Sequence, residues 1–360
     1  MNRRGFWNLD FGILVPVCVL LIISLATLFS LNISFFQSQI FFLVIAVAGF
    51  LFFSQVNYKV LLLYKTPIYI ISLVLLAIVL VLGIESRGAV RWIEIVGFRI
   101  QFSEVLKPFL AVSLAAFLTE RKNTSFKTFV QAFAFVLPVV FLIFLQPDLG
   151  DALIYFIVAL CVLIIFGFNL KYFLASIFPV IIAFPLFWHF LHDYQRQRVL
   201  TFFDPGRDPL GNSYNSIQSI IAVGSGMIVG KGFGQGTQSG LRFLPERNTD
   251  FIFATISEQL GFIGTAIMLI CFVFILYRIY VIFRDSNDKF CKIFSGTVFF
   301  IFLIQIFVNI GMNIGILPIV GVTLPFVSSG GSSLLSNFII LGLLSAVNRS
   351  LKREDVLEIK

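Results

Sequence analysis

Long apolar runs with almost no charge recur along nearly the whole of this sequence. Runs of about 18 or more such residues are long enough to cross the hydrocarbon core of a membrane as helices. Only 12% of the 360 residues are charged, against roughly 25% in an average globular protein. A single water-soluble core is therefore excluded, and the sequence predicts an all-α, polytopic membrane protein.

The runs predict about ten membrane spans in one integral membrane domain that covers residues 1–360. The first span is too long for the core of a signal peptide, so we expect it to be retained. The longest connection, 193–249, joins the seventh span to the eighth and contains several turn-forming segments. The spans are predicted near 10–31, 36–54, 66–83, 103–119, 129–146, 150–168, 171–192, 250–277, 293–313 and 330–348.

Basic residues in the short loops predict the orientation, because such residues are concentrated in cytoplasmic loops. With ten spans they fall on one side, so both termini are predicted to be cytoplasmic and the loop 193–249 to be extracytoplasmic. The segment 84–102 mixes aromatic, apolar and charged residues and is expected to lie at the same outer surface. The basic residues concerned are Arg3, Arg4, Lys59, Lys65, Arg121, Lys122, Lys127, Lys171, Arg278, Arg284, Lys289, Lys292, Arg349, Lys352 and Arg353.

Sequence motifs of several common enzyme and metal sites are absent. The chain has no GxSxG, HExxH or CxxCH motif, and its four cysteines form no CxxC pair, so neither a disulfide framework nor a zinc site is indicated. The run GSGMIVGKGFGQGTQSG does not match the GxxxxGK[ST] pattern of a phosphate-binding loop. The net charge of +8 is dispersed over helix ends, which favours topology signals over a nucleic-acid surface. Any chemistry is therefore expected to use carboxylates and basic residues.

Asp250 lies in LPERNTDFIF, where a charged turn changes at once into an apolar helical pattern. One interpretation is a helix cap, because Asp and Thr are favoured at that position. The other is a general base at the boundary between water and lipid. Glu258 follows eight residues later, about 12 Å deeper along the same helix at 1.5 Å per residue. Ionisable groups at such a depth are candidates for function, although an interhelical hydrogen bond or ion pair is the alternative.

Three further groups of polar residues precede spans or follow them. Glu104 and Lys107 are three residues apart, so they can pair with each other, or Lys107 can bind an anionic ligand that Glu104 orients. Asp148 in QPDLGD is expected to cap the next helix or to serve the site. Arg196 and Arg198 can bind either lipid head groups or a phosphate. The long loop carries the basic residues Arg196, Arg198, Arg207, Lys231, Arg242 and Arg247.

Several long motifs, in this order, resemble the SEDS family (shape, elongation, division and sporulation proteins). They are Gln195–Gly211, Gln218–Gly240, Leu244–Phe253 and Leu317–Asn337, together with GFRIQFSEVLKP and LQPDLGD. The pair GKGFGQGTQ and LPERNTDFIF is more similar to the RodA-like branch than to the FtsW-like branch. The sequence departs from the family pattern at Asn248, where His is usual, at Phe102, where Pro is usual, and at Asp151, where Thr or Ser is usual.

The resemblance implies a peptidoglycan glycosyltransferase of the bacterial cytoplasmic membrane that polymerises lipid II at the outer face for cell elongation and division. It implies that Asp250 is the catalytic acid residue and that Glu104, Lys107 and Asp148 line the cavity. It further implies a class B penicillin-binding protein and other elongation-complex membrane proteins as partners. The one candidate cofactor is a divalent cation, Mg²⁺ or Mn²⁺.

The residues agree with this chemistry, because inversion at an α-linked donor needs a base for the acceptor 4-hydroxyl and cations for the leaving pyrophosphate. Asp250 can supply the base, and Lys107, Arg196 and Arg198 the positive charge. Two rival hypotheses remain. A lipid II flippase would need polar groups through the full membrane depth, and a scaffold would not need Asp250.

Overall fold

The computed structural model describes residues 10–86, 89–95, 97–204, 206, 208, 211 and 213–358. Arg3, Arg4 and Arg207 therefore lie outside the described residues. The helices are α1 (Phe11–Leu31), α2 (Ile33–Gln55), α3 (Tyr58–Leu63), α4 (Lys65–Leu82), α5 (Phe102–Val105), α6 (Lys107–Thr119), α7 (Phe126–Leu145), α8 (Leu149–Phe166), α9 (Leu170–Phe190), α10 (Asp193–Phe203), α11 (Tyr214–Ser225), α12 (Thr237–Gly240), α13 (Ile252–Asp285), α14 (Lys289–Asn313) and α15 (Gly331–Glu358).

Eight helices in the described part of the chain are long and apolar enough to cross a membrane, namely α1, α2, α4, α7, α8, α13, α14 and α15. The predicted fourth and seventh spans coincide with α6, which has 13 residues, and α9, which has 21. A helical, polytopic membrane architecture is confirmed, whereas the number of ten spans stays a prediction.

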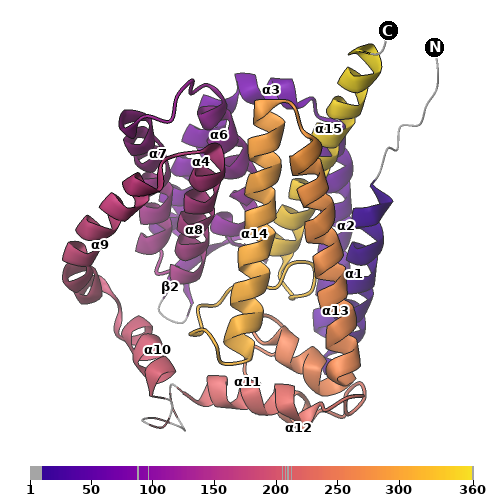
Figure 1. Ribbon diagram of the computed structural model, residues 1–360. Coiled ribbons are helices and arrows are strands. Elements are labelled where there is room, and N and C mark those ends of the chain that lie inside the picture. The colour runs from indigo at the N-terminus through magenta and orange to yellow at the C-terminus, as the bar shows by residue number, and fades with distance from the viewer. Residues whose placement is uncertain are drawn as a thin grey trace.

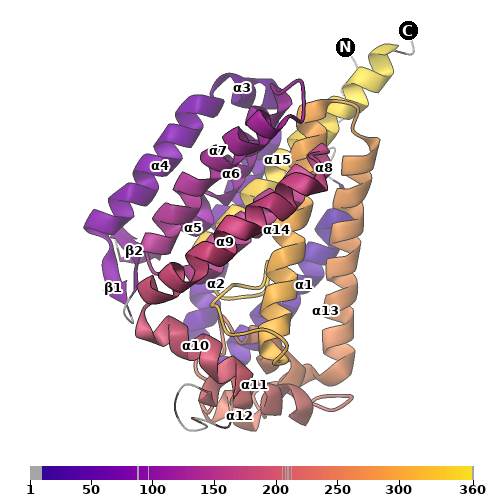
Figure 2. The same ribbon diagram turned by 60° about the vertical axis from the view of Figure 1, so that its left-hand side comes forward.

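The long helices form a bundle in which α13 and α14 lie side by side and α14 also contacts α6 and α8. Figure 1 shows α10, α11 and α12 across one end of the bundle, which we call the loop end. The opposite end, which we call the α3 end, carries α3 and the turn between α13 and α14. Figure 2 shows α9 running diagonally across the outside of the bundle toward α10.

The segment 84–102, expected to lie at the membrane surface, contains a small antiparallel sheet, an exception to the all-α prediction. Its strands are β1 (Ile84–Ser86), β2 (Ala89–Ile95) and β3 (Phe98–Ile100), in that order. Alternating and β-branched residues in AVRWIEI favour a strand, and Gly97, with φ +79°, turns β2 into β3. The register pairs Glu94 with Arg99. The sheet matters because β2 presents Arg91 to the start of α8.

Helix α13 is broken at Gly261, which has φ 64° and ψ −161°, a conformation that essentially only glycine adopts. The break leaves backbone groups without helical partners, and the segment 227–232 of the long loop bonds to them. After the break, the amides of Phe262 and Ile263 donate to the carbonyls of Met227 and Ile228, at 2.8 and 3.0 Å respectively. Before it, the carbonyls of Glu258 and Gln259 accept from the amides of Lys231 and Gly232, at 2.9 and 3.0 Å. The loop is thus fastened to the half-helix that follows Asp250.

Candidate functional site

Asp250 precedes α13 and does not cap it. The helix begins at Ile252, and the capping residue is Phe251, which has no side-chain cap. The amide of Ala254 in the first turn instead donates to Oδ1 of Asn313 on α14, at 3.1 Å. Of the two interpretations of Asp250, the helix cap is therefore wrong, because a neighbouring helix satisfies the amide that a local cap would have satisfied.

The backbone of Asp250 is nevertheless held firmly. Its carbonyl accepts from Nδ2 of Asn309, at 3.1 Å, and from Nδ2 of Asn313, at 2.9 Å. Asn309 is itself fully buried and also donates to the carbonyl of Val322, at 2.7 Å, so α13, α14 and the loop after α14 meet at this point. Within the described residues no group donates a hydrogen bond to the Asp250 carboxylate. The backbone of Asp250 is thus held in place, whereas its carboxylate has no hydrogen-bond donor in the described part of the chain.

An arginine from a distant part of the chain reaches the same place. A Cβ atom on Gly321 would lie 3.5 Å from Oδ2 of Asp250, so the loop after α14 passes directly beside the carboxylate. Arg198, on α10, donates to the carbonyl of Ile319 in that loop, at 3.4 Å. The long loop therefore brings a guanidinium group close to Asp250, while the predicted binding of a phosphate by Arg198 stays a prediction.

The surroundings of Asp250 change its acidity. Burial raises the pKa of Asp250 to about 6, and the nearby carboxylate of Glu246 raises it further, while Arg198 and Arg91 oppose the rise. The ordinary pKa of an aspartate is about 3.9. A carboxylate with this pKa is a stronger proton acceptor than a solvated one and is still mostly ionised at neutral pH.

Asp148 forms the second acidic point of the site and does cap its helix, α8, as predicted. Its Oδ1 accepts from the amide of Asp151, at 3.2 Å, and its Oδ2 accepts from Nε2 of Gln101, at 2.7 Å. Arg91 lies 3.7 Å from Oδ1. Burial raises the pKa of Asp148 to about 6, with Asp151 adding to the rise and Arg91 opposing it. Asp148 is thus both a cap and an anchor for Arg91.

Lys107 is enclosed by acidic groups. Its Nζ lies 2.7 Å from Oε1 of Glu104 and 2.9 Å from Oδ1 of Asp151, and its side chain is 2% exposed. Thr323, in the loop after α14, also donates to Glu104, at 3.4 Å. Of the two interpretations of the Glu104–Lys107 spacing, the geometry supports the ion pair, and Asp151 adds a second carboxylate to it.

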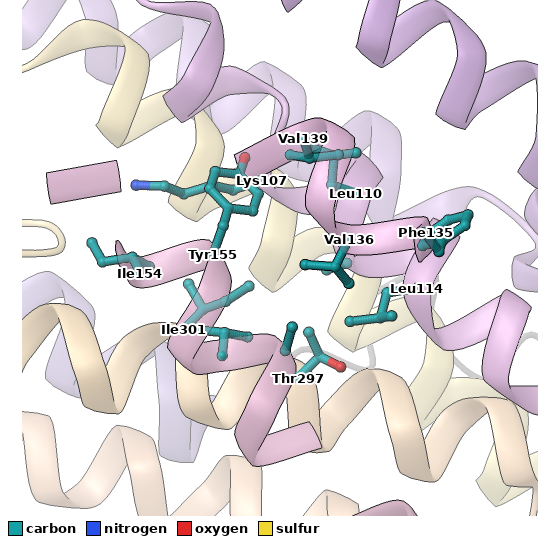
Figure 3. A pocket seen from close by; sticks show the side chains of 13 residues that line it. Lys107, Leu110, Leu114, Phe135, Val136, Val139, Ile154, Tyr155, Thr297 and Ile301 are labelled. Carbon is teal, nitrogen blue, oxygen red and sulfur yellow. The ribbon is translucent and has the colours of Figure 1, made fainter. Parts of the chain in front are cut away.

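Figure 3 shows a pocket beside Lys107, lined by residues of α6, α7, α8 and α14. Apolar side chains such as Leu110, Val139 and Ile301 line it, and the ammonium group of Lys107 points away from them. Tyr155 also lines the pocket, and its hydroxyl donates to the carbonyl of Ser103, at 2.7 Å. The ion pair therefore separates an apolar cavity inside the bundle from the polar groups nearer Asp148.

Arg196 and Glu258 have their own structural partners. Nε of Arg196 donates to the carbonyl of Trp188, at 3.0 Å, and its Nη1 lies 3.6 Å from Asp193, so Arg196 joins α9 to α10. Glu258 is fully buried and accepts from the hydroxyl of Ser239, at 2.7 Å. It also accepts from the amides of Gln238 and Ser239, both at 2.9 Å. Its third partner is Nζ of Lys231, at 3.1 Å. Both side chains hold the long loop in place.

Arg91 is the main residue of the site that the sequence did not single out. The surrounding sequence suggested only an interfacial segment, and nothing in it indicates that β2 turns this guanidinium toward Asp148. Its Nε is buried and has no hydrogen-bond partner among the described residues. Among those residues, no group of three or more His, Cys, Asp or Glu side chains is arranged to hold a metal ion.

Comparison with known proteins gives the same picture for the whole chain. Residues 5–353 match the family model of FtsW, RodA and SpoVE, described as "Cell cycle protein". The chain is 35% identical to peptidoglycan glycosyltransferase MrdB of Escherichia coli K12, over 96% of both chains. It is 38% identical to a probable peptidoglycan glycosyltransferase FtsW of Wigglesworthia glossinidia brevipalpis, over 78% of this chain and 75% of that protein.

Solved structures are similar over nearly the full length. One chain from a study of how a peptidoglycan synthase complex coordinates polymerisation and crosslinking has a TM-score of 0.83 and 29% identity, over 96% of this chain and 99% of that one. The rod shape determining protein RodA of Thermus thermophilus shares the fold, with a TM-score of 0.73 and 24% identity, over 96% and 98% of the two chains. This chain therefore belongs to the FtsW, RodA and SpoVE family of cell cycle proteins.

Proposed function

We propose that this chain is a peptidoglycan glycosyltransferase that polymerises lipid II into β-1,4-linked glycan for cell elongation, with Asp250 as the general base. The observation that carries the assignment is a carboxylate with a fixed backbone and no hydrogen-bond donor among the described residues, beside the arginines of β2 and α10. The relatives named as peptidoglycan glycosyltransferases support the reaction class.

In the proposed step, the 4-hydroxyl of the acceptor sugar attacks the anomeric carbon of the donor. Asp250 takes the hydroxyl proton as the new carbon–oxygen bond forms. The bond from the anomeric carbon to the pyrophosphate breaks, and the electron pair leaves with the lipid pyrophosphate. Attack opposite to the leaving group converts the α-linked donor into a β-linked product, so one base is sufficient.

The leaving pyrophosphate needs positive charge, and Arg91 and Arg198 are the proposed source. Guanidinium groups bind phosphate oxygens through several donors at once, and Nε of Arg91 has no partner among the described residues. Asp148 orients Arg91. Lys107 is enclosed by Glu104 and Asp151, so we assign Glu104 and Lys107 a positioning role and no direct phosphate contact.

A divalent cation fits these residues poorly, and no step is derived through one. Lys107 already lies between Glu104 and Asp151, and Asp148 is occupied by Arg91 and Gln101. Asp250 alone remains as a carboxylate without a donor among the described residues. Polymerisation measured with and without Mg²⁺ or Mn²⁺ at constant ionic strength tests whether the reaction needs the ion.

The proposal places the site on the outer side of the cytoplasmic membrane and both termini on the inner side. It also assigns the chain a class B penicillin-binding protein as its partner. The similar chain from a synthase complex that coordinates polymerisation and crosslinking supports a crosslinking partner. The predominance of basic residues in the loops of the α3 end supports the orientation.

A lipid II flippase is less well supported. In the described part of the chain, the charged side chains that are almost fully buried are Glu104, Lys107, Asp148, Asp151, Arg247 and Glu258. Five of them belong to the first turns of helices or to the long loop, and Glu258 contacts that loop through Gln238, Ser239 and Lys231. A translocation path would need such groups deeper in the bundle as well.

The test is polymerisation of lipid II by purified protein, with and without a class B penicillin-binding protein. Asp250→Asn keeps the size of the side chain and removes the base, so we expect glycan synthesis to fall by about 10²–10⁴-fold. Asp204→Asn, the same change at an exposed aspartate of the long loop, should leave synthesis near wild type. Equal synthesis by the two variants, at equal stability, would refute the assignment of the base.

A further inference from the structure

A second charged pocket lies at the α3 end, away from Asp250. It has a volume of about 480 Å³. Arg121 and Lys122 line it from the connection between α6 and α7, and Lys289 and Lys292 line it from the first turn of α14. The end of α8 closes it with apolar side chains, among them that of Phe166. The proposed glycosyltransferase reaction makes no use of this pocket.

The charge of this basic pocket is not balanced by its own walls. Four cationic side chains line it and no acidic one does. Lys289 and Lys292 also lie at the positive end of α14, where cations are unfavourable and anions are favoured. The acids that directly precede these basic residues in the sequence have other partners, because Glu120 pairs with Lys65 and Asp288 accepts from the amide of Cys291 as the cap of α14. A bound anion would offset the accumulated positive charge.

Aromatic rings hold these cations in place. The guanidinium carbon of Arg121 lies 4.5 Å from the centre of the Phe117 ring, and Nζ of Lys289 lies 4.8 Å from the centre of Phe166. Lys289 also donates to the backbone carbonyl of Arg121, which ties α14 to the end of α6. Nε of Arg121 is buried and has no hydrogen-bond partner among the described residues. The basic side chains are therefore held in position before any ligand binds, and Nε of Arg121 remains available to donate to one.

The position of the pocket favours a lipid over a soluble anion. It lies where α8 ends and α14 begins, two helices long and apolar enough to cross the membrane, so it opens at the level of the lipid head groups. Ile164 and Ile165 of α8 are 48% and 39% exposed next to it. We propose that the basic pocket binds the phosphate head group of an anionic diacyl phospholipid, with its acyl chains against this exposed face of α8.

The experiment measures lipid retention by the full-length purified protein in native mass spectrometry. Phosphatidylglycerol and phosphatidylcholine with the same acyl chains are added in turn. The double variant Lys289→Gln/Lys292→Gln should bind phosphatidylglycerol about 30-fold more weakly, since each basic residue contributes about 1 kcal/mol near an anionic lipid and 1.4 kcal/mol is tenfold. The matched control Lys127→Gln/Lys171→Gln removes the same charge from exposed positions of the same end and should bind as wild type does.

Three results would overturn the proposal. The control double variant could lose as much affinity as the pocket variant, which would indicate a general attraction to a basic face. Phosphatidylcholine could be retained as well as phosphatidylglycerol. Inorganic phosphate or glycerol 3-phosphate could displace the lipid at millimolar concentration, which would make the ligand a soluble anion. If the double variant is unstable, Lys292→Gln alone serves, because Lys292 is exposed.

Discussion

Asp250 has a rigid backbone and an unconstrained carboxylate. The two asparagines of α14 hold its carbonyl, at 2.9 and 3.1 Å, whereas no described residue donates to its side chain. The side chain of Asp250 is only partly buried, so its carboxylate oxygens remain accessible to a ligand. The arrangement of Asp250 therefore suits a residue whose hydrogen-bond partner arrives with the substrate.

The pKa of Asp250 predicts how activity depends on pH. As the proposed base, Asp250 would work only as a carboxylate, and burial raises its pKa to about 6, so half of it is ionised near that pH. We expect kcat/KM for polymerisation to be level near pH 7–8 and to fall about tenfold per unit well below pH 6. Initial rates between pH 5 and 8 measure this. A profile level down to pH 5 would contradict a raised pKa.

Substitutions of Lys107 and of Asp151 should have very different effects on the stability of the protein. Lys107→Ala leaves the buried carboxylates of Glu104 and Asp151 without their cation, and breaking a buried pair in this way costs about 3–5 kcal/mol. Asp151→Asn retains the contact between Lys107 and Glu104 and should cost much less. Thermal unfolding in detergent compares the two. A similar loss of stability for both variants would show that Lys107 is not the cation that compensates both Glu104 and Asp151.

The same three residues explain why a charge swap should fail. Exchanging Glu104 and Lys107 for each other would place a carboxylate at position 107, beside Asp151. Two acids would then face each other in a buried site, where like charges are costly. The sequence indicated the pairing of Glu104 with Lys107 from their spacing, but the part of Asp151 depends on how α6 packs against α8, which local spacing does not contain.

The broken helix α13 is the element that shapes the site. Its first part carries Glu258 and is fastened to the long loop, and its second part crosses the bundle. Gly261 should tolerate no side chain, because a Cβ there would lie 2.3 Å from the amide nitrogen of Gly230 and the conformation itself excludes other residues. Position 224 in α11 has nothing within 4 Å of an added Cβ.

We therefore expect Gly261→Ala to destabilise the protein by more than 2 kcal/mol, within the range for strained backbone combined with overpacking. Gly224→Ala, the same change in a regular helix, should stabilise it by about 0.5–1 kcal/mol. Thermal unfolding of both variants measures this. The prediction fails if the two substitutions have effects of the same sign and size.

Glu258 should control how often the long loop opens. Glu258→Gln removes a charged acceptor from the amides of Gln238 and Ser239, and hydrogen bonds to charged groups contribute about 1.5–3 kcal/mol. Cleavage by trypsin after the exposed Arg242 should then be roughly 10–100-fold faster. Glu94→Gln, at the partly exposed pair with Arg99, is the matched control. Unchanged cleavage of the Glu258 variant would show that other contacts hold the loop.

The helices of the bundle could be predicted from sequence because the length and composition of each apolar run indicate a membrane-spanning helix without reference to the rest of the chain. The sheet 84–100 and the break at Gly261 could not, since both depend on partners far away in the chain. A strand of seven residues in AVRWIEI gives a weak local signal, and an isolated glycine in an apolar run has several explanations. The interpretation of Asp250 as a cap failed for the same reason, because the amide of Ala254 donates to Asn313, which is 59 residues away.

At the scale of the whole molecule, the two ends of the bundle differ in chemistry. The α3 end carries the basic pocket, while the loop end carries the acidic and arginine residues around Asp250. Lipid-facing side chains cover the helices between them, such as Phe262 and Phe274 of α13, which are 69% and 55% exposed. A protein built in this way has one preferred orientation in an asymmetric membrane, because short basic loops remain in the cytoplasm.

Reporter fusions test that orientation. Ser125, between α6 and α7, and Asn169, between α8 and α9, cap their helices near the basic pocket, so fusions there should report the cytoplasm. A fusion at Gln235, just before α12, should report the outside.

The fusions also test the count of spans. With the segment 84–100 outside, a cytoplasmic Ser125 requires the short helix α6 to cross the membrane. A cytoplasmic Asn169 together with an outside Gln235 requires α9 to cross it. If the Gln235 fusion reported the cytoplasm, Asp250 would face the side where lipid II is made and not the side where glycan is laid down. The polymerase assignment would then fail at the scale of the whole molecule, even if each residue at the site behaved as predicted.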